Sequence, residues 1–177
     1  MDALAPFRIP AAALKADEAT YEWKLGSDFL SLFDAGHEGI NGEFDVTMEL
    51  LREGGMTTLE FFIQGVVPTT CDRCMAPIQL EIDAEYQMIV KIGDPEESND
   101  EVIFVDPDSP DLNVANHIYD FILVSVPISH RIPDCEQLDP SPCDRSVLDY
   151  LAKNQDEMQI PGDTTSPWDK LKNVTDN

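Results

Sequence analysis

The residues best suited to chemistry are four cysteines, which the chain carries as two pairs. Cys71 and Cys74 stand two residues apart in the stretch CDRC, and Cys135 and Cys143 follow much later. Tetrahedral zinc takes four thiolate or imidazole ligands, often as a CxxC pair that a distant second pair completes. The sequence therefore predicts a zinc site made of Cys71, Cys74, Cys135 and Cys143, with His130 as an alternative ligand.

Two other interpretations of the cysteines stay open at this point. The segment between Cys135 and Cys143 is too long for a second tight CxxC turn, although its two prolines could fold it back. The thiols could then be ordinary buried or surface groups that bind no metal. A redox-active CxxC is less favoured, because such pairs usually lie at a helix N-terminus, where the dipole lowers a thiol pKa.

The other polar residues form no catalytic pattern. His37, His117 and His130 are scattered and have no nucleophile motif beside them. The chain contains no phosphate-binding glycine loop, no GxSxG and no HExxH. A metal-dependent nuclease would need a tight carboxylate cluster, whereas the acids here are dispersed. We therefore predict that the protein is not an enzyme.

The charge of the chain is its strongest compositional signal. The 35 Asp and Glu residues outnumber 11 Lys and Arg, which gives a formal net charge of −24. Nucleic-acid binding normally uses a basic face, so we expect no direct contact with RNA. Complementary charge favours a basic partner instead, although acidity can also serve solubility alone. No apolar run is long enough to span a membrane and the N-terminus lacks a signal-peptide pattern, so we predict a cytoplasmic protein.

The spacing of apolar residues predicts an α+β fold. Alternation with period two is clearest from Ile78 to Val90, and it predicts a long, half-buried antiparallel strand. CDRC then joins this strand to the preceding one. We expect the strands to form an antiparallel meander that could close into a barrel. The other predicted strands cover 21–25, 44–51, 58–67 and 101–105.

One main helix is predicted to pack on this sheet. Apolar residues recur at spacings of three and four from Leu112 to Val126, with Asp111 as the expected N-cap and Pro127 as the end. A shorter helix is predicted from Asp144. We place a single domain at residues 1–153. Residues 154–177 are predicted to be a polar, flexible tail with an apolar island, PWDKL, at 167–171, which could dock on a partner or pack on its own domain.

Several of these motifs, in this order, resemble a known family. CDRCMAPIQLEIDAEY is followed, after an acidic loop, by DLNVANHIYDFILVSVPISHRIPDCE, and SPWDKL lies near the end. This arrangement is similar to that of the YceD-type large ribosomal RNA subunit accumulation proteins, from about residue 40 onward. Arg73 matches the arginine inside the CxxC, Pro127 the proline after the helix, and Cys135 the late cysteine. Cys143 is an additional cysteine.

The resemblance implies a role in the accumulation of large-subunit ribosomal RNA and hence in ribosome assembly. Together with the charge, it predicts a non-enzymatic factor that acts through a basic ribosomal protein or a basic assembly factor. The alternative is a zinc-stabilised, acidic protein-interaction module with no ribosomal role. Co-sedimentation with large-subunit precursors would separate the two.

Overall fold

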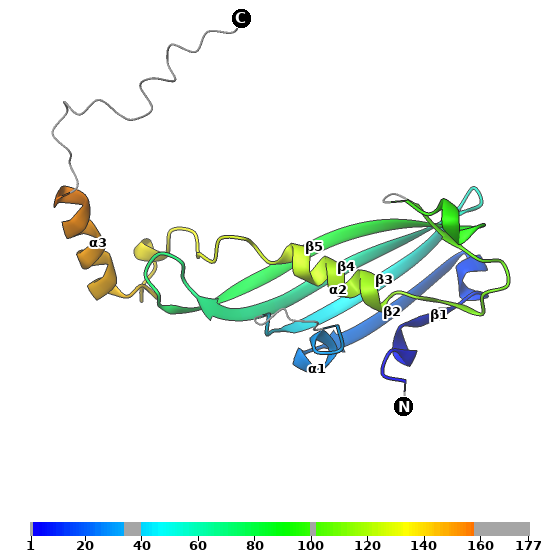
Figure 1. Cartoon of the computed structure of the whole chain (residues 1–177), viewed down its shortest axis with the longest axis horizontal. Helices are drawn as coiled ribbons and strands as arrows, with labels where there is room; N and C mark the ends of the chain where they lie inside the picture. Colours follow the sequence, from blue (N-terminus) through cyan, green and yellow to red (C-terminus); the bar gives the residue numbers. More distant parts are fainter. Residues whose placement is uncertain (1, 34–39, 100–101, 158–177) are drawn as a thin grey trace, which may run out of the picture.

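The computed structural model describes residues 2–33, 40–99 and 102–157, which form the α+β fold that the sequence predicts (Figure 1). A five-stranded sheet has the order β2-β3-β4-β5-β6, and a two-stranded sheet pairs β1 with β7. The strands are β1 Arg8–Pro10, β2 Glu18–Leu25, β3 Glu43–Glu53, β4 Met56–Thr70, β5 Pro77–Ile92, β6 Val102–Val105 and β7 Asp111–Asn113. The α-helices are α1 Ser27–Leu30, α2 Ala115–Ser125 and α3 Arg145–Glu157. The 3-10 turns are η1 Ala5–Phe7, η2 Ala13–Lys15, η3 Pro95–Glu97 and η4 Cys135–Gln137.

The predicted meander is present in β2 to β5, where each strand pairs antiparallel with the next. β3 and β4 are joined by Gly54 and Gly55, both with positive φ. Two consecutive positive φ values define the type of two-residue turn whose twist suits a hairpin, and glycine adopts them without a Cβ clash. β4 and β5 are the longest strands and carry the CDRC turn between them.

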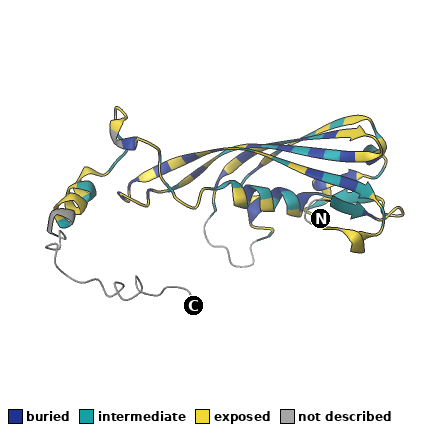
Figure 2. Ribbon diagram, turned by 90° about the horizontal axis from the view of Figure 1, so that it is seen from above, coloured by how far each residue is buried: buried dark blue, intermediate teal, exposed yellow. Residues whose placement is uncertain are grey.

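The expectation that the sheet could close into a barrel is wrong. Within the described residues, β2 pairs only with β3, and β6 pairs with β5 over four residues in a parallel arrangement, so the sheet stays open. Barrel closure would require the two edge strands to pair along their length. The sheet does not have to close to cover its apolar side chains, because α2 and the N-terminal segment cover one of its faces (Figure 2).

The core lies between this inner face of the sheet and α2. Along each strand, alternate side chains point inward and are buried, including Val46, Phe61 and Ile63 at 1% exposed or less. Ile118 and Ile122 of α2 are fully buried against them. Phe121 of α2 stacks on Tyr86 of β5, with ring centroids 4.6 Å apart. None of the helices among the described residues is long and apolar enough to cross a membrane.

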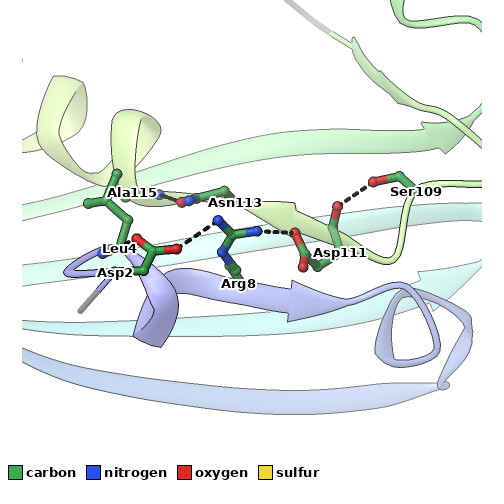
Figure 3. Close-up of polar contacts among 7 residues, drawn as sticks. All are labelled: Asp2, Leu4, Arg8, Ser109, Asp111, Asn113 and Ala115. Carbon is green, nitrogen blue, oxygen red and sulfur yellow. Dashed lines mark hydrogen bonds and ion pairs between the residues drawn. The ribbon is translucent and has the colours of Figure 1, made fainter.

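The predicted N-cap of α2 is also wrong. Asp111 lies in β7, which pairs with β1, and Arg8 of β1 bridges Asp2 at 2.8 Å and Asp111 at 3.5 Å (Figure 3). The helix starts instead at Ala115, whose backbone N–H donates to the Asn113 side chain. The strand partner lies about a hundred residues upstream, so local sequence signals could not reveal it.

Candidate functional site

The CDRC turn closes the far end of the β4–β5 hairpin. The backbone N–H of Cys71 donates to the carbonyl of Ala76, and that of Met75 donates to the carbonyl of Cys71. Met75 adopts the left-handed conformation with φ 59°. This tight turn directs both Cys71 and Cys74 inward, and their side chains are 2% and 1% exposed.

The chain returns to this turn after α2. The Asp72 N–H donates to the carbonyl of His130, and the His130 N–H donates to the Asp72 carboxylate at 2.7 Å. These two bonds fix the segment that carries the second cysteine pair against the hairpin end. Ser141 then bonds to the carbonyl of Cys135 and accepts from the N–H of Cys143, which folds the proline-containing loop back on itself.

As a result, all four cysteines line one small space. The Cys143 and Cys135 sulfurs are 3.0 Å apart, with Cys143 as the donor. Cys71, Cys74, Cys135 and Cys143 enclose this space together with three apolar residues, Ile78, Ile132 and Pro142. The spacing of Cys135 and Cys143 does not determine how the loop between them folds, so their approach to the CDRC turn depends on these tertiary hydrogen bonds.

The surroundings give two of the thiols different pKa values. Backbone N–H groups, first that of Ala76 and then that of Asp144, point at the Cys74 sulfur and lower the pKa of Cys74, against the opposing effect of burial. The hydrogen bond to Cys135 has the opposite effect on Cys143 and raises its pKa. N–H groups directed at sulfur favour a thiolate, which is the form that binds metals.

The donor set fits zinc, but the sulfur positions do not yet match a metal site. Among the described residues, no group of three or more His, Cys, Asp or Glu side chains is placed to hold a metal ion as it stands. Two thiolates on a tetrahedral zinc lie about 3.8 Å apart, given Zn–S bonds of about 2.3 Å. The 3.0 Å contact between Cys135 and Cys143 is shorter, so these sulfurs would have to separate by less than about 1 Å.

The histidines lie elsewhere. His130 does not line the space between the cysteines. Its ring Nδ1 is 3.3 Å from the Thr69 hydroxyl and 3.9 Å from the Asp72 carboxylate, behind the CDRC turn. His117 is partly buried on α2. His37 and the PWDKL island fall outside the described residues.

A second candidate surface is the outer face of the five-stranded sheet, which none of the described elements covers (Figure 2). The side chains of this face alternate along each strand with the buried side chains of the core. Lys24, the lysine that β2 contributes to this face, is paired with Asp45 at 2.7 Å. Glu49 and Glu60 lie directly opposite each other on β3 and β4. We call this surface the acidic face and define it by Glu18, Glu22, Glu43, Asp45, Glu49, Glu53, Glu60, Glu81, Asp83 and Glu85.

The strand register brings these acids into rows. Asp45, Gln64 and Asp83 are cross-strand neighbours, and Glu43, Val66 and Glu81 form the next outward row. An open hollow of about 780 Å³ crosses the face over these two rows. The alternating acids were visible in the sequence of β5, but the rows across strands could be found only once the register was known.

One comparison with known proteins identifies the family. The family described as "Large ribosomal RNA subunit accumulation protein YceD" matches residues 59–175, more than half of the chain. The matched region includes the CDRC turn, β5, α2 and all four cysteines. No curated protein and no solved structure matches the chain significantly. The chain therefore belongs to the YceD family of large ribosomal RNA subunit accumulation proteins.

Proposed function

We propose that this protein is a non-enzymatic factor in large-subunit ribosomal RNA accumulation that works by binding a basic protein. The observation that carries the proposal is the acidic face, because it concentrates carboxylates on a sheet surface that no described element covers. Ribosomal proteins and many assembly factors are basic since they contact RNA phosphates. Complementary charge accelerates association with such a partner and selects against acidic ones.

The same charge argues against direct RNA binding. A net charge of −24 repels phosphate, and the lysine of β2 on the acidic face is already paired with Asp45. We therefore propose that the protein affects ribosomal RNA through its partner, by delivering it or by shielding its basic surface. In that role the fold supplies a rigid charged surface and needs no reacting group.

The test is recovery of partners by the tagged, full-length chain at moderate salt, combined with sedimentation of cell extracts. We expect a basic ribosomal protein or assembly factor in the eluate and co-sedimentation of the chain with large-subunit precursors. A basic partner without any co-sedimentation would favour the interaction module with no ribosomal role. Recovery of no basic protein by the wild-type chain would overturn the proposal.

We also propose that the four cysteines hold a structural zinc ion. They bring four sulfurs from two distant segments together, and N–H groups favour the Cys74 thiolate. When bound, zinc would link the hairpin end to the segment after α2. Because such a site does not exist in the unfolded chain, the binding free energy would contribute directly to folding.

Metal content of the purified protein tests this site. We expect about one zinc per chain in the wild type, and loss of zinc in single Cys→Ser variants at 71, 74, 135 and 143. Met75→Asn is the matched control, because Met75 is exposed and asparagine tolerates its left-handed conformation. His130→Ala should keep the metal. Zinc loss in His130→Ala with retention in Cys143→Ser would make His130 the fourth ligand instead.

A further inference from the structure

β5 has a long edge that no strand of the described chain occupies. It pairs with β4 from Pro77 to Val90, but its other edge pairs with β6 only from Ile89 to Ile92. Figure 1 shows β5 along the upper border of the sheet, with β6 beside one end only. From Ile78 to Met88 the edge therefore presents backbone N–H and C=O groups without a partner strand among the described residues. Such an edge is a template for another strand.

The central outward side chains along this edge are acidic, and Gln79 and Gln87 flank them. Glu81, Asp83 and Glu85 are exposed at alternate positions, so their Cα atoms lie roughly 7 Å apart along the strand. None of the ion pairs found within the described residues involves them. Asp83 accepts only a long, 3.4 Å hydrogen bond from Gln64. A strand with cations at every second position would place each cation opposite one of these carboxylates.

The inward side of the same edge is apolar. Ala84 and Tyr86 are only partly buried, and Tyr86 is stacked under Phe121 of α2. Val124 follows Phe121 by three residues, so both lie on the same side of the helix, and Val124 is 67% exposed. Ala84, Tyr86 and Phe121 therefore form a partly buried apolar shelf beside the edge. An added strand could place its second set of side chains on this shelf.

We propose that the basic partner binds by adding a β-strand to β5 along Ile78–Met88, with lysine or arginine alternating with apolar residues. This inference rests on the proposed function for the basic character of the partner, and adds where it binds and what sequence pattern it needs. Main-chain hydrogen bonds supply affinity in this binding mode, and alternate side chains supply specificity. Acids that merely guard the edge against self-pairing would explain Glu81, Asp83 and Glu85, but not the partly buried apolar shelf on the other side of the edge.

The other edge of the sheet provides the comparison. β2 also has an edge that no strand of the described chain occupies, but its outward residues include Lys24 as well as Glu18 and Glu22, so its charge is mixed. Glu18→Lys/Glu22→Lys changes the net charge as much as Asp83→Lys/Glu85→Lys, on the same face of the same sheet. The two double variants therefore separate binding at β5 from attraction by total charge.

The first test uses two synthetic peptides with the full-length protein. One alternates five lysines with five valines, and the other has the same composition in two blocks. We expect the alternating peptide to bind at least about tenfold more tightly, and Asp83→Lys/Glu85→Lys to lose about tenfold while Glu18→Lys/Glu22→Lys loses much less. Bound peptide should slow hydrogen exchange of amides within Ile78–Met88. Equal binding of both peptides, or equal losses in both variants, would overturn the proposal.

Backbone methylation gives a sharper test of strand addition. In a β-strand, successive N–H groups point to opposite edges, so N-methyl groups on all lysines block one edge of the peptide and N-methyl groups on all valines block the other. Strand addition predicts that only one of these two methylated peptides still binds. Binding held only by charge predicts that both bind alike, which would contradict the proposal.

Recovery of the natural partner separates a failure of this inference from a failure of the proposed function. If the wild type recovers a basic protein and Asp83→Lys/Glu85→Lys recovers it equally well at the same salt, strand addition at β5 is wrong and the proposed function stands. If the wild type recovers none, the proposed function itself fails, whatever the synthetic peptides do.

Discussion

The inner face of the five-stranded sheet is covered by α2 and the N-terminal segment, whereas the outer face of the same strands has no described element over it (Figure 2). The inner face is almost wholly apolar and fully buried at Met48, Leu59 and Phe61. The outer face carries the acids of the acidic face. Neighbouring residues along each strand point to opposite faces. A shift of a strand by one residue would therefore move its side chains from the core to the acidic face.

This contrast separates stability from recognition. Side chains on the inner face contribute to folding by burial, and their loss leaves a cavity. Carboxylates on the outer face contribute little to folding and repel one another, so they serve either solubility or, under the proposed function, attraction of a basic partner. The following predictions test how complete that separation is.

The largest expected difference lies between two adjacent phenylalanines of β4. Phe61 is fully buried and packs against Phe121, whereas Phe62 points outward and is only partly buried. Phe61→Ala should lower the free energy of unfolding by about 3–5 kcal/mol, and Phe62→Ala by about 1 kcal/mol or less. Urea denaturation of both variants measures this. Similar losses would mean that the outer face is covered too.

A smaller effect is expected where two strands approach closely. A Cβ on Gly65 would lie 2.5 Å from the Phe44 ring and 2.6 Å from the Glu43 carbonyl oxygen. Gly65→Ala should therefore destabilise the protein by about 1–3 kcal/mol, since the ring must move within a packed core. Gly26→Ala is the control, because no heavy atom lies within 4 Å of its Cβ position. An unfolding midpoint for Gly65→Ala equal to that of Gly26→Ala would show that the Phe44 ring and the β3 backbone can move aside at little energetic cost.

Much of the sheet could be predicted because its information is local. Alternation identified β3, β4 and β5. The β1–β7 pair could not be predicted, since three-residue strands have almost no pattern and these two are about a hundred residues apart. The same distance explains why Asp111 was expected to cap a helix.

The candidate sites also combine features that local sequence predicts with features that depend on distant contacts. CDRC could be proposed as half of a ligand set from sequence alone, because two cysteines separated by two residues can share one tight turn. The approach of Cys143 to Cys135 depends on the turn at Ser141 and on the Asp72–His130 bonds, which are contacts that spacing does not encode. The acidic face needed the register of four strands, and the open edge of β5 needed the knowledge that the sheet does not close.

The outer face should gain stability when its repulsion is relieved. Glu60 lies opposite Glu49, and like charges in directly opposed positions destabilise a sheet. Glu60→Lys should raise the free energy of unfolding by about 0.2–1 kcal/mol. Glu22→Lys is the matched control, because its cross-strand neighbour on β3 is Thr47 rather than an acid. The difference between the two variants should shrink in about 1 M salt, and a difference that persists there would point to packing rather than charge.

The smallest expected effect is a pH dependence on the covered side of the sheet. Burial lowers the pKa of His117 below its ordinary value of 6.5, although Asp120, one turn further along α2, acts in the opposite direction. Below pH 6.5 the unfolded chain binds a proton at this position before the folded chain does, so stability is lost as the pH falls from 6.5 toward the pKa of the folded state. His117→Gln removes this loss and leaves the carboxylates in place. Unfolding midpoints at two pH values, one on each side of 6.5, should therefore fall less in His117→Gln than in the wild type. Equal falls would show that the pKa of His117 is the same in the folded and the unfolded chain. His117 would then be more accessible to water than its partial burial on α2 indicates.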